Sequence, residues 1–259
     1  MSVSQFGQTD NNFLGATLMT IAAVHQPQYF PYLGFFHKLA RADIFIAMDS
    51  VEFLRRGLQH RNKIKTRTGE QWLTVPVFHQ EKQHILQVQI DRELPWARKH
   101  WGTLKTNYQP APYFDLYASE LQQILCQDWS SLCELNMTLL QWVMQKLDIH
   151  IPIVRLSELK VEGHKSELLI YACQAVGADT YLSGSGGRRY MDLSLFEAAG
   201  VKVLWQEFAH PLYPQLFPQV GFISQLSILD VLFCCGPDTC KFLDAEPLNP
   251  QRLEPVCCY

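Results

Sequence analysis

Ile21-Ala-Ala-Val-His-Gln-Pro-Gln-Tyr-Phe-Pro-Tyr-Leu-Gly34 is the stretch that decides the fold, together with the two segments that follow it, Phe35–Arg41 and Asp43–Met48. An apolar run ends in polar residues, two prolines stiffen the turn, and a helical pattern begins after the glycine. The short helix and the second apolar run predict two parallel strands joined by a right-handed crossover. Because open α/β sheets bind ligands at the carboxyl ends of their strands, we expect a site in the loop after Val24.

The same alternation of strands and helices returns in the second half of the chain. We expect strands at Ile151–Arg155, Thr180–Leu182 and Lys202–Trp205, and helices at Ser166–Val176, Leu193–Ala199 and Ser227–Phe233. Gly177 and Gly200 stand where left-handed residues end helices. The pattern predicts an α/β fold, in which a mostly parallel sheet carries flanking helices and an inserted helical lobe.

The pattern changes between the two halves. Trp72–Val77 is strand-like, and Ile85–Ile90 alternates apolar and polar residues as a half-exposed edge strand would. The following region predicts three helices, and Asp128–Ser131 is expected to cap the helix Leu132–Leu147. The predicted organisation is a sheet domain at 21–95 and 151–236, a helical lobe at 96–150, a polar and disordered extension at 1–20, and a tail at 237–259.

Composition limits the classes of partner. With 47% hydrophobic residues and a net charge of −3 in 259 residues, the chain is expected to fold, and its overall field favours neither nucleic acid nor an anionic membrane. Its eight cysteines form no C-x-x-C pair, so we expect reduced thiols and no metal site. Neither a signal peptide nor a membrane-spanning segment is recognisable, which predicts a cytoplasmic location.

His25 is the first candidate for chemistry. A histidine at a strand end can hydrogen-bond a ligand or act as a general acid or base, whereas the alternative is a structural histidine tied to the backbone. Its neighbours offer further polar groups, and Asp49 ends the next strand at the same edge of the sheet. The binding candidates around this loop are Gln26, Gln28, Tyr29, Lys38 and Asp49.

A cluster of basic and amide side chains follows the second strand. We interpret it as a loop that recognises phosphate or carboxylate groups, the alternative being a basic loop that faces water. Its residues are Arg55, Arg56, Gln59, Arg61, Asn62, Lys63 and Lys65.

A glycine-rich segment lies between a predicted strand and a predicted helix. Backbone N–H groups of such a segment can hold an anion, although the spacing matches neither a dinucleotide fingerprint nor a P-loop, and an ordinary turn is the alternative. The candidate binding residues are Ser183, Gly184, Ser185, Gly186, Gly187 and Arg188.

A second histidine loop, His210-Pro-Leu-Tyr-Pro-Gln215, follows the last predicted strand. It combines a histidine, prolines, an aromatic residue and an amide, as the opening loop does. We expect both loops to share one cleft, with His210 as a second catalytic candidate and Tyr213 and Gln215 as binding residues. The alternative is that the His-Pro pair only sets a turn.

Five motifs in order resemble the WbqC-like protein family over residues 21–236. They are His25–Gly34, Arg61–Ile64, Trp72–Val77, Tyr181–Gly187 and His210–Gln215. The resemblance implies a cytoplasmic protein that acts on or near an activated sugar, because the family is associated with bacterial O-antigen gene clusters. The resemblance does not identify any catalytic residue in this chain. Relatives have Ser-Gly-Pro-Gly-Gly in the glycine-rich segment, and here Ser185 replaces the proline.

The opening segment is also similar, more distantly, to nucleotidyltransferases related to pantothenate synthetase. Their first loop holds His-x-Gly-His, and this chain has His25 with Gln28 in place of the second histidine. That similarity implies adenylate chemistry with ATP and Mg²⁺, although half of the signature is missing.

Three hypotheses follow for a small-molecule substrate, either a nucleotide sugar or a nucleotide. The first is a transferase that acylates or aminoacylates a nucleotide-activated amino sugar, with His25 or His210 removing the amine proton and Gln26, Gln28 and Asn62 orienting polar groups. The second is nucleotidyl transfer from ATP. The third is a sugar-nucleotide binding protein without catalysis. The cofactor, the donor and the oligomeric state stay open.

Overall fold

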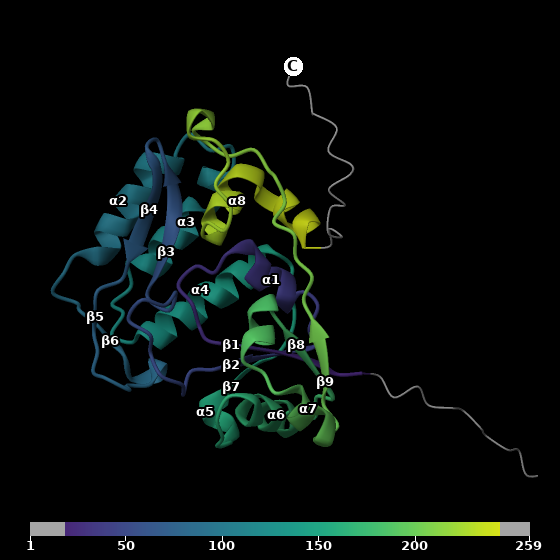
Figure 1. The fold of residues 1–259 in the computed structure, drawn as a ribbon. Coiled ribbons are helices and arrows are strands. Elements are labelled where there is room, and N and C mark those ends of the chain that lie inside the picture. The colour runs from purple at the N-terminus through teal and green to yellow at the C-terminus, as the bar shows by residue number, and fades with distance from the viewer. Residues whose placement is uncertain (1–18, 244–259) are drawn as a thin grey trace, which may run out of the picture.

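A five-stranded parallel sheet forms the centre of the protein in the computed structural model, which describes residues 19–243 (Figure 1). The strand order is β7-β2-β1-β8-β9. The strands are β1 Ile21–His25, β2 Ile44–Ala47, β7 Ile153–Arg155, β8 Thr180–Ser183 and β9 Lys202–Trp205. The α/β fold class predicted from the sequence is therefore confirmed.

The direction in which the sheet grows reverses beside β1. The chain moves outward from β1 to β2 and β7, and then crosses back to place β8 and β9 on the other side of β1. Ala22 of β1 therefore pairs with Ile44 of β2 on one side and with Tyr181 of β8 on the other. The loops after β1 and β8 leave toward opposite faces, and such a switch point opens a crevice at the strand ends.

Helices cover both faces of the sheet (Figure 1). Ala23 and Phe45 of the sheet join a large apolar cluster, whereas Ala22 and Val24 join a second one, since alternate residues of a strand face opposite sides. The helices on the first face are α1 Leu33–Leu39, α2 Trp96–Tyr108, α3 Phe114–Leu125, α4 Leu132–Lys146 and α8 Ile228–Cys235. The helices on the second face are α5 Leu156–Leu159, α6 Ser166–Ala175 and α7 Leu193–Ala198.

Most predicted elements occur within one to three residues of their expected bounds. The three helices between residues 96 and 150 are present, and the Ser131 hydroxyl caps α4 by accepting from the Glu134 N–H at 3.3 Å. Gly177 and Gly200 both have φ of +71°, as expected of residues that end helices. α5 was not predicted, because a single turn has too few residues to show helical periodicity.

Two predictions in the first half are wrong in part. The basic cluster is not all loop, since β3 Arg61–Thr66 pairs antiparallel with β4 Gly69–Thr74. Of Ile85–Ile90 only Gln89–Ile90 forms a strand, β6, which pairs with β5 Val77–Phe78. The residues Ile85–Gln87 form a 3₁₀ turn instead. Ile85 and Val88 are buried at a spacing of three, which suits a 3₁₀ turn and leaves Leu86 exposed.

The helices of the predicted lobe share their core with the sheet. Leu104, Leu121 and Leu139 belong to the same apolar cluster as Phe35 and Phe45. The chain continues after α8 as a 3₁₀ helix, Gly236–Phe242. The predicted extension up to residue 18, and the tail from residue 244 with its two cysteines, lie outside the described residues.

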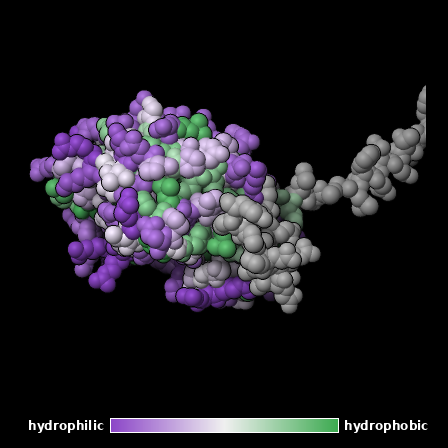
Figure 2. Space-filling model, turned by 90° about the horizontal axis from the view of Figure 1, so that it is seen from above, coloured by the Kyte–Doolittle hydropathy of each residue, from purple (hydrophilic) through white to green (hydrophobic). Residues whose placement is uncertain are grey.

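The surface seen from above Figure 1 is hydrophilic over most of its area, with hydrophobic side chains in small separate groups (Figure 2). Within residues 19–243, none of the helices combines the length and the apolar character needed to cross a bilayer. The cysteines in this range are free thiols.

Candidate functional site

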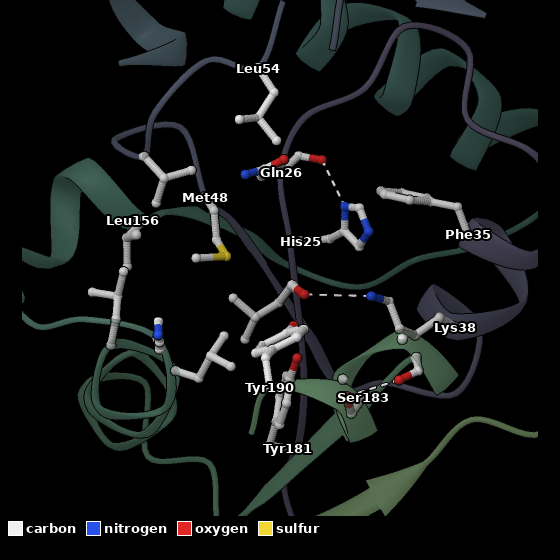
Figure 3. Close-up of a pocket in the computed structure, with 18 of the residues that line it drawn as sticks. His25, Gln26, Phe35, Lys38, Met48, Leu54, Leu156, Tyr181, Ser183 and Tyr190 are labelled. Atoms are coloured by element: carbon white, nitrogen blue, oxygen red, sulfur yellow. Dashed lines mark hydrogen bonds between the residues drawn. The ribbon is translucent and has the colours of Figure 1, made fainter. Parts of the chain in front are cut away.

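A cavity of about 1430 Å³ opens at the carboxyl ends of the parallel strands. Its lining comes from the end of β1, from α1, and from the segments that follow β2, β7, β8 and β9. Figure 3 shows His25, Lys38 and Ser183 on one side of this cavity and Met48 and Leu156 on the other. The cavity thus lies across the switch point between β1 and β8, where open α/β sheets bind ligands.

His25 presents a neutral imidazole to the cavity. Its Nδ1 lies 3.0 Å from the carbonyl oxygen of Gln26, which assigns the ring proton to Nδ1 and leaves a lone pair on Nε2. The ring packs edge-on against Phe35, with the centroids 5.0 Å apart. Burial, and next the charge of Lys38, lower the pKa of His25 to about 3. The imidazole is therefore a hydrogen-bond and proton acceptor at neutral pH.

Lys38 places a buried amine beside this histidine. The residue comes from α1 and is 4% exposed, and its Nζ donates to the carbonyl oxygen of Val24 at 3.5 Å. No carboxylate of residues 19–243 forms an ion pair with it. Burial lowers the pKa of Lys38 to about 7, so the amine changes charge near neutral pH. A buried cation without a counter-ion is suited to hold an anionic ligand or an oxyanion.

The glycine-rich segment forms the floor next to these two residues. Ser183 ends β8, and its hydroxyl donates to the carbonyl oxygen of Gly184 at 3.1 Å. A Cβ added to Gly187 would lie 2.2 Å from the Ser183 Oγ, whereas a Cβ on Gly186 would meet nothing within 4 Å. The N–H groups of Ser185 and Gly186, at the start of a 3₁₀ turn, find no acceptor in the described part of the chain, and both residues line the cavity. Two backbone donors are thus available to a ligand.

His210 supplies a second neutral imidazole to the cavity. Its Nδ1 lies 3.0 Å from the carbonyl oxygen of Pro211, and its ring lies among those of Phe208, Tyr213 and Phe222. Burial lowers the pKa of His210. The two histidine loops therefore meet at one cavity, although the sequence separates them by most of the chain.

The structure brings only some of the residues predicted from the sequence to the cavity. Those that line it are His25, Gln26, Lys38, Ser183, Gly184, Ser185, Gly186, Gly187 and His210. Those that do not line it are Gln28, Tyr29, Asp49, Arg56, Gln59, Arg61, Asn62, Lys63, Arg188, Tyr213 and Gln215.

Two residues of the second group hold the opening loop in shape. Gln59 donates to the side-chain oxygen of Gln26 at 2.7 Å, which fixes the amide that lines the cavity. Asn62 donates to the carbonyl oxygen of Phe30 at 2.6 Å, and Phe30 has a φ of +46°. Because a bulky residue rarely adopts this left-handed conformation, the Asn62 amide supports a strained turn of the loop.

Tyr29 and Asp49 are also structural. The Tyr29 hydroxyl is buried and hydrogen-bonds His100 Nδ1 at 2.9 Å, joining the opening loop to α2. The Asp49 carboxylate accepts from the N–H of Ser157 at 3.0 Å and from its hydroxyl at 2.7 Å. A carboxylate in this position satisfies the first turn of α5 and is not open to the cavity.

The basic cluster does not line the cavity. The guanidinium of Arg61 lies over the ring of Trp72, 4.5 Å from its centroid, and the Lys63 amine lies 5.0 Å from the same centroid. Lys63 also forms an ion pair with Glu70 across the hairpin, while Arg56 is exposed. Arg61 and Lys63 thus already have aromatic or acidic partners, and neither lines the cavity, although the sequence analysis named both as binding candidates.

Tyr213 and Gln215 belong to a buried polar network around Asp230. The Asp230 carboxylate accepts from the hydroxyls of Tyr108 at 2.6 Å and Tyr213 at 2.9 Å, and from the amide of Gln215 at 2.9 Å. Lys65 reaches the same amide side chain at 3.1 Å. Burial raises the pKa of Asp230, while its hydroxyl partners oppose that change. The network joins β3, α2 and α8 behind the cavity.

Several residues on the cavity rim were missed by the sequence reasoning. They lie in polar loops without periodicity or a motif, and some adopt left-handed backbone conformations that no glycine or asparagine signalled. The charged and histidine residues missed in this way are Glu52, Lys82, His84, Glu162, His164 and Lys165.

A metal site is not preformed in the described range. Residues 19–243 contain no group of three His, Cys, Asp or Glu side chains placed to hold a metal ion.

Comparison with known proteins agrees with the motifs quoted above. The family model described as "WbqC-like protein family" matches residues 26–242, and so includes almost the whole cavity lining. The chain is also 33% identical over 232 residues to "Uncharacterized protein Rv1507c" from Mycobacterium tuberculosis. That match covers 87% of this chain and 98% of the relative.

Proposed function

We propose that this chain, which belongs to the WbqC-like protein family, is a cytoplasmic transferase that acts on a nucleotide-activated amino sugar in bacterial surface-polysaccharide synthesis. The reaction we propose is N-acyl or aminoacyl transfer to the sugar amine. One observation carries the proposal: a neutral imidazole, His25, and a buried amine, Lys38, which has no carboxylate partner within residues 19–243, line the same cavity beside backbone donors that find no acceptor in that range.

The size of the cavity supports a large substrate. Pockets for drug-sized ligands occupy roughly 300–1,000 Å³. A volume of about 1430 Å³ leaves room for a nucleotide sugar together with part of an acyl donor. A reaction between two bound molecules needs such a site, because holding both in contact removes much of the entropic barrier.

The chemistry assigns a role to each group. The sugar amine attacks the acyl carbon, a C–N bond forms, and the bond from that carbon to the leaving group of the donor breaks. Nε2 of His25 accepts the amine proton and returns it to the leaving group. A weak base suffices because the proton becomes acidic only as the C–N bond forms. The Lys38 ammonium and the N–H groups of Ser185 and Gly186 donate to the transient oxyanion.

Nucleotidyl transfer receives less support from the arrangement. Its signature needs two histidines in the first loop, and Gln28, in the position of the second, does not line the cavity. Binding without catalysis is an outcome that the same experiment distinguishes.

The test is a transfer assay with the purified chain. UDP-, dTDP- and GDP-linked amino sugars are each mixed with acyl-CoA or aminoacyl donors, and the product is identified by its mass in a mass spectrometer. The matched controls are the same sugars with the amine already acetylated, which should not react. We expect His25→Ala to abolish transfer, and His210→Ala tests the competing base.

Each result has a defined meaning. Unchanged turnover in His25→Ala overturns the assignment of the base. Release of pyrophosphate from ATP, with no acylated sugar, would replace the proposal by nucleotidyl transfer. Saturable binding of a nucleotide sugar with no product from any donor would identify a binding protein.

A further inference from the structure

One amide side chain that lines the cavity has no role in the reaction proposed so far. Gln206 comes directly after β9, and its backbone N–H donates to the carbonyl oxygen of Ser183 at 2.8 Å. This bond holds Gln206 beside the end of β8, where the glycine-rich segment begins. Its amide group therefore belongs to the part of the cavity wall that a ligand contacts.

The orientation of the Gln206 amide is fixed by α1. Its Nε2 lies 2.7 Å from the carbonyl oxygen of Gly34 and 3.0 Å from Nδ1 of the buried His37. A carbonyl oxygen only accepts hydrogen bonds, so the atom that faces Gly34 is the amide nitrogen. The two hydrogens of this nitrogen serve Gly34 and His37, and the amide cannot turn over without losing both bonds.

The amide oxygen of Gln206 is left as an acceptor for a ligand. It accepts no hydrogen bond from the residues that the structure describes, 19–243. It lies 3.8 Å from the position that a Cβ on Gly184 would occupy, and Gly184 comes directly before Ser185 and Gly186. The Gln206 oxygen is thus next to the segment whose N–H groups we propose to hold the oxyanion.

His25 provides a second acceptor in the same cavity, and it contacts the same turn of α1. The His25 ring packs against Phe35 with 5.0 Å between the centroids, whereas the Gln206 amide donates to Gly34, the neighbouring residue. Consecutive Cα atoms are about 3.8 Å apart, so a single turn of helix positions both acceptors. Lys38 belongs to this helix as well.

A primary amine is the group that can donate to both acceptors. As the C–N bond forms, one hydrogen passes as a proton to Nε2 of His25 and from there to the leaving group of the donor. The other hydrogen stays on the nitrogen in the product amide. A hydroxyl has one hydrogen, which must go to the base, so it leaves the Gln206 oxygen without a donor. A polar group left unpaired in this way weakens binding of the wrong substrate.

We infer that Gln206 selects an amine over a hydroxyl as the group that is acylated, because its Oε1 accepts the N–H that stays on the attacking nitrogen. This inference rests on the proposed function, of which it specifies the acceptor group. Gln206 is then a specificity-determining residue, while His25 keeps the role of the base.

Two variants separate this role from a structural one. Gln206→Met and Gln206→Glu both lose the donor to Gly34 and His37, but only Gln206→Glu keeps an oxygen that can accept a hydrogen bond. Gln174→Met is the matched control, because Gln174 donates to the carbonyl oxygen of Ala199 at 3.3 Å from an exposed position that does not line the cavity. The melting temperature of each variant reports the structural contribution of the lost bonds.

The substrates are pairs of UDP-, dTDP- and GDP-linked sugars that differ only in an amine or a hydroxyl at one carbon. Calorimetric titration gives the Kd of each sugar, and the transfer assay gives kcat/KM for N-acylation and for O-acylation. We expect the wild-type protein to prefer the amine. Gln206→Met should lower this preference about tenfold, the effect of one hydrogen bond, by acting on the amine alone. Gln206→Glu and Gln174→Met should keep the preference.

Failure of this inference can be distinguished from failure of the proposed function. A Gln206→Met protein that acylates sugars and keeps the wild-type preference overturns the inference and leaves the transferase in place. Equal loss of preference in Gln206→Met and Gln206→Glu overturns it as well, because it would indicate a structural role. A binding preference that Gln206→Met removes, in a protein that transfers no acyl group, keeps the amine site and removes the transferase.

A test on the wild-type protein replaces the variants should Gln206→Met fail to fold. An N-methylated amino sugar attacks as a secondary amine, which has one hydrogen and so matches the hydroxyl in its number of donors. We expect its kcat/KM to fall about tenfold from that of the primary amine. An N-methylated sugar that is acylated as readily as the primary amine, or a wild-type protein that acylates neither, would then overturn the inference.

Discussion

The Nζ atom of Lys38 lies 3.5 Å from the carbonyl oxygen of Val24, the residue immediately before His25. This distance is long for a hydrogen bond, so the contact compensates little of the free energy lost when the ammonium leaves water. The fold therefore carries a buried cation that lowers its stability. A buried ammonium of this kind is expected where a bound ligand supplies the negative charge that the protein does not.

Replacing this amine should make the protein more stable and less active. Lys38→Met keeps most of the side-chain volume and removes a group whose pKa burial lowers from 10.5 to about 7. We expect the free energy of unfolding at pH 7 to rise by about 2–4 kcal/mol, measured by urea denaturation, with transfer activity lost. Lys105→Met, at an exposed position of α2, is the control and should change stability by less than about 0.5 kcal/mol. A destabilised Lys38→Met protein would contradict this account.

Mild acid should destabilise the protein through its buried histidines. Burial lowers the pKa of His25 to about 3 and those of His60 and His100 to about 4. In the unfolded chain these histidines bind protons near pH 6.5, whereas in the folded chain they stay neutral until the pH is much lower. The free energy of unfolding therefore falls as the pH falls from 6.5 toward 4. Each histidine should account for about 2 kcal/mol between pH 7 and pH 5.

Urea unfolding at the two pH values checks this dependence. His60→Gln should reduce the difference between the unfolding free energies at pH 7 and pH 5 by about 2 kcal/mol, the contribution of one histidine, because glutamine does not titrate. Equal unfolding free energies of the wild-type protein at pH 7 and pH 5 would refute the prediction.

The two central glycines of the glycine-rich segment should differ in their tolerance of a methyl group. Gly187→Ala would place Cβ 2.2 Å from the Ser183 Oγ and 2.8 Å from the Met191 sulfur, so the segment must shift. We expect a loss of about 1–3 kcal/mol in stability and a lower melting temperature. Gly186→Ala is the matched control, because its Cβ has open space. Similar melting temperatures for the two variants would show that the segment is not packed as described.

The network around Asp230 should contribute to stability from behind the cavity. Asp230→Ala removes the acceptor of two tyrosine hydroxyls and of one Gln215 hydrogen bond, together with the negative charge near Lys65, and we expect a loss of about 3–5 kcal/mol. Tyr213→Phe removes the hydroxyl that donates to Asp230 and accepts from Gln215, while the carboxylate keeps its other partners, so a loss of about 1–2 kcal/mol is expected. Asp238→Asn, in an exposed ion pair with Lys241, is the control and should be close to neutral. Denaturation curves of Asp230→Ala and Asp238→Asn that coincide would contradict this role.

Local patterns were sufficient to predict the sheet and one end of the site. Ile21–Val24 and Lys202–Trp205 have the composition and length of buried strands, and the parallel topology then places His25 and the glycine-rich segment at one edge. The sheet and this end of the site follow from rules that act over short stretches of chain. The helix cap at Ser131 follows from such a rule as well.

The errors involve contacts between distant residues. Arg61 could not be assigned to Trp72 without knowing that the two lie on paired strands of one hairpin. Asp49 ends a strand as a binding residue would, yet its partner Ser157 lies 108 positions away. Lys82 and Lys165 are 83 positions apart and line one cavity only in the folded protein, which no local pattern indicates.

The place of α8 has a consequence for how the chain is made. All eight of its residues are buried, and they pack in the cluster that includes α1 and the sheet, although α8 leaves the ribosome after all five strands of the sheet. β1, the central strand, likewise waits for β8, more than 150 positions later. The nascent chain therefore keeps apolar surface uncovered until α8 has been made, which makes it a candidate for chaperone binding and a slow folder.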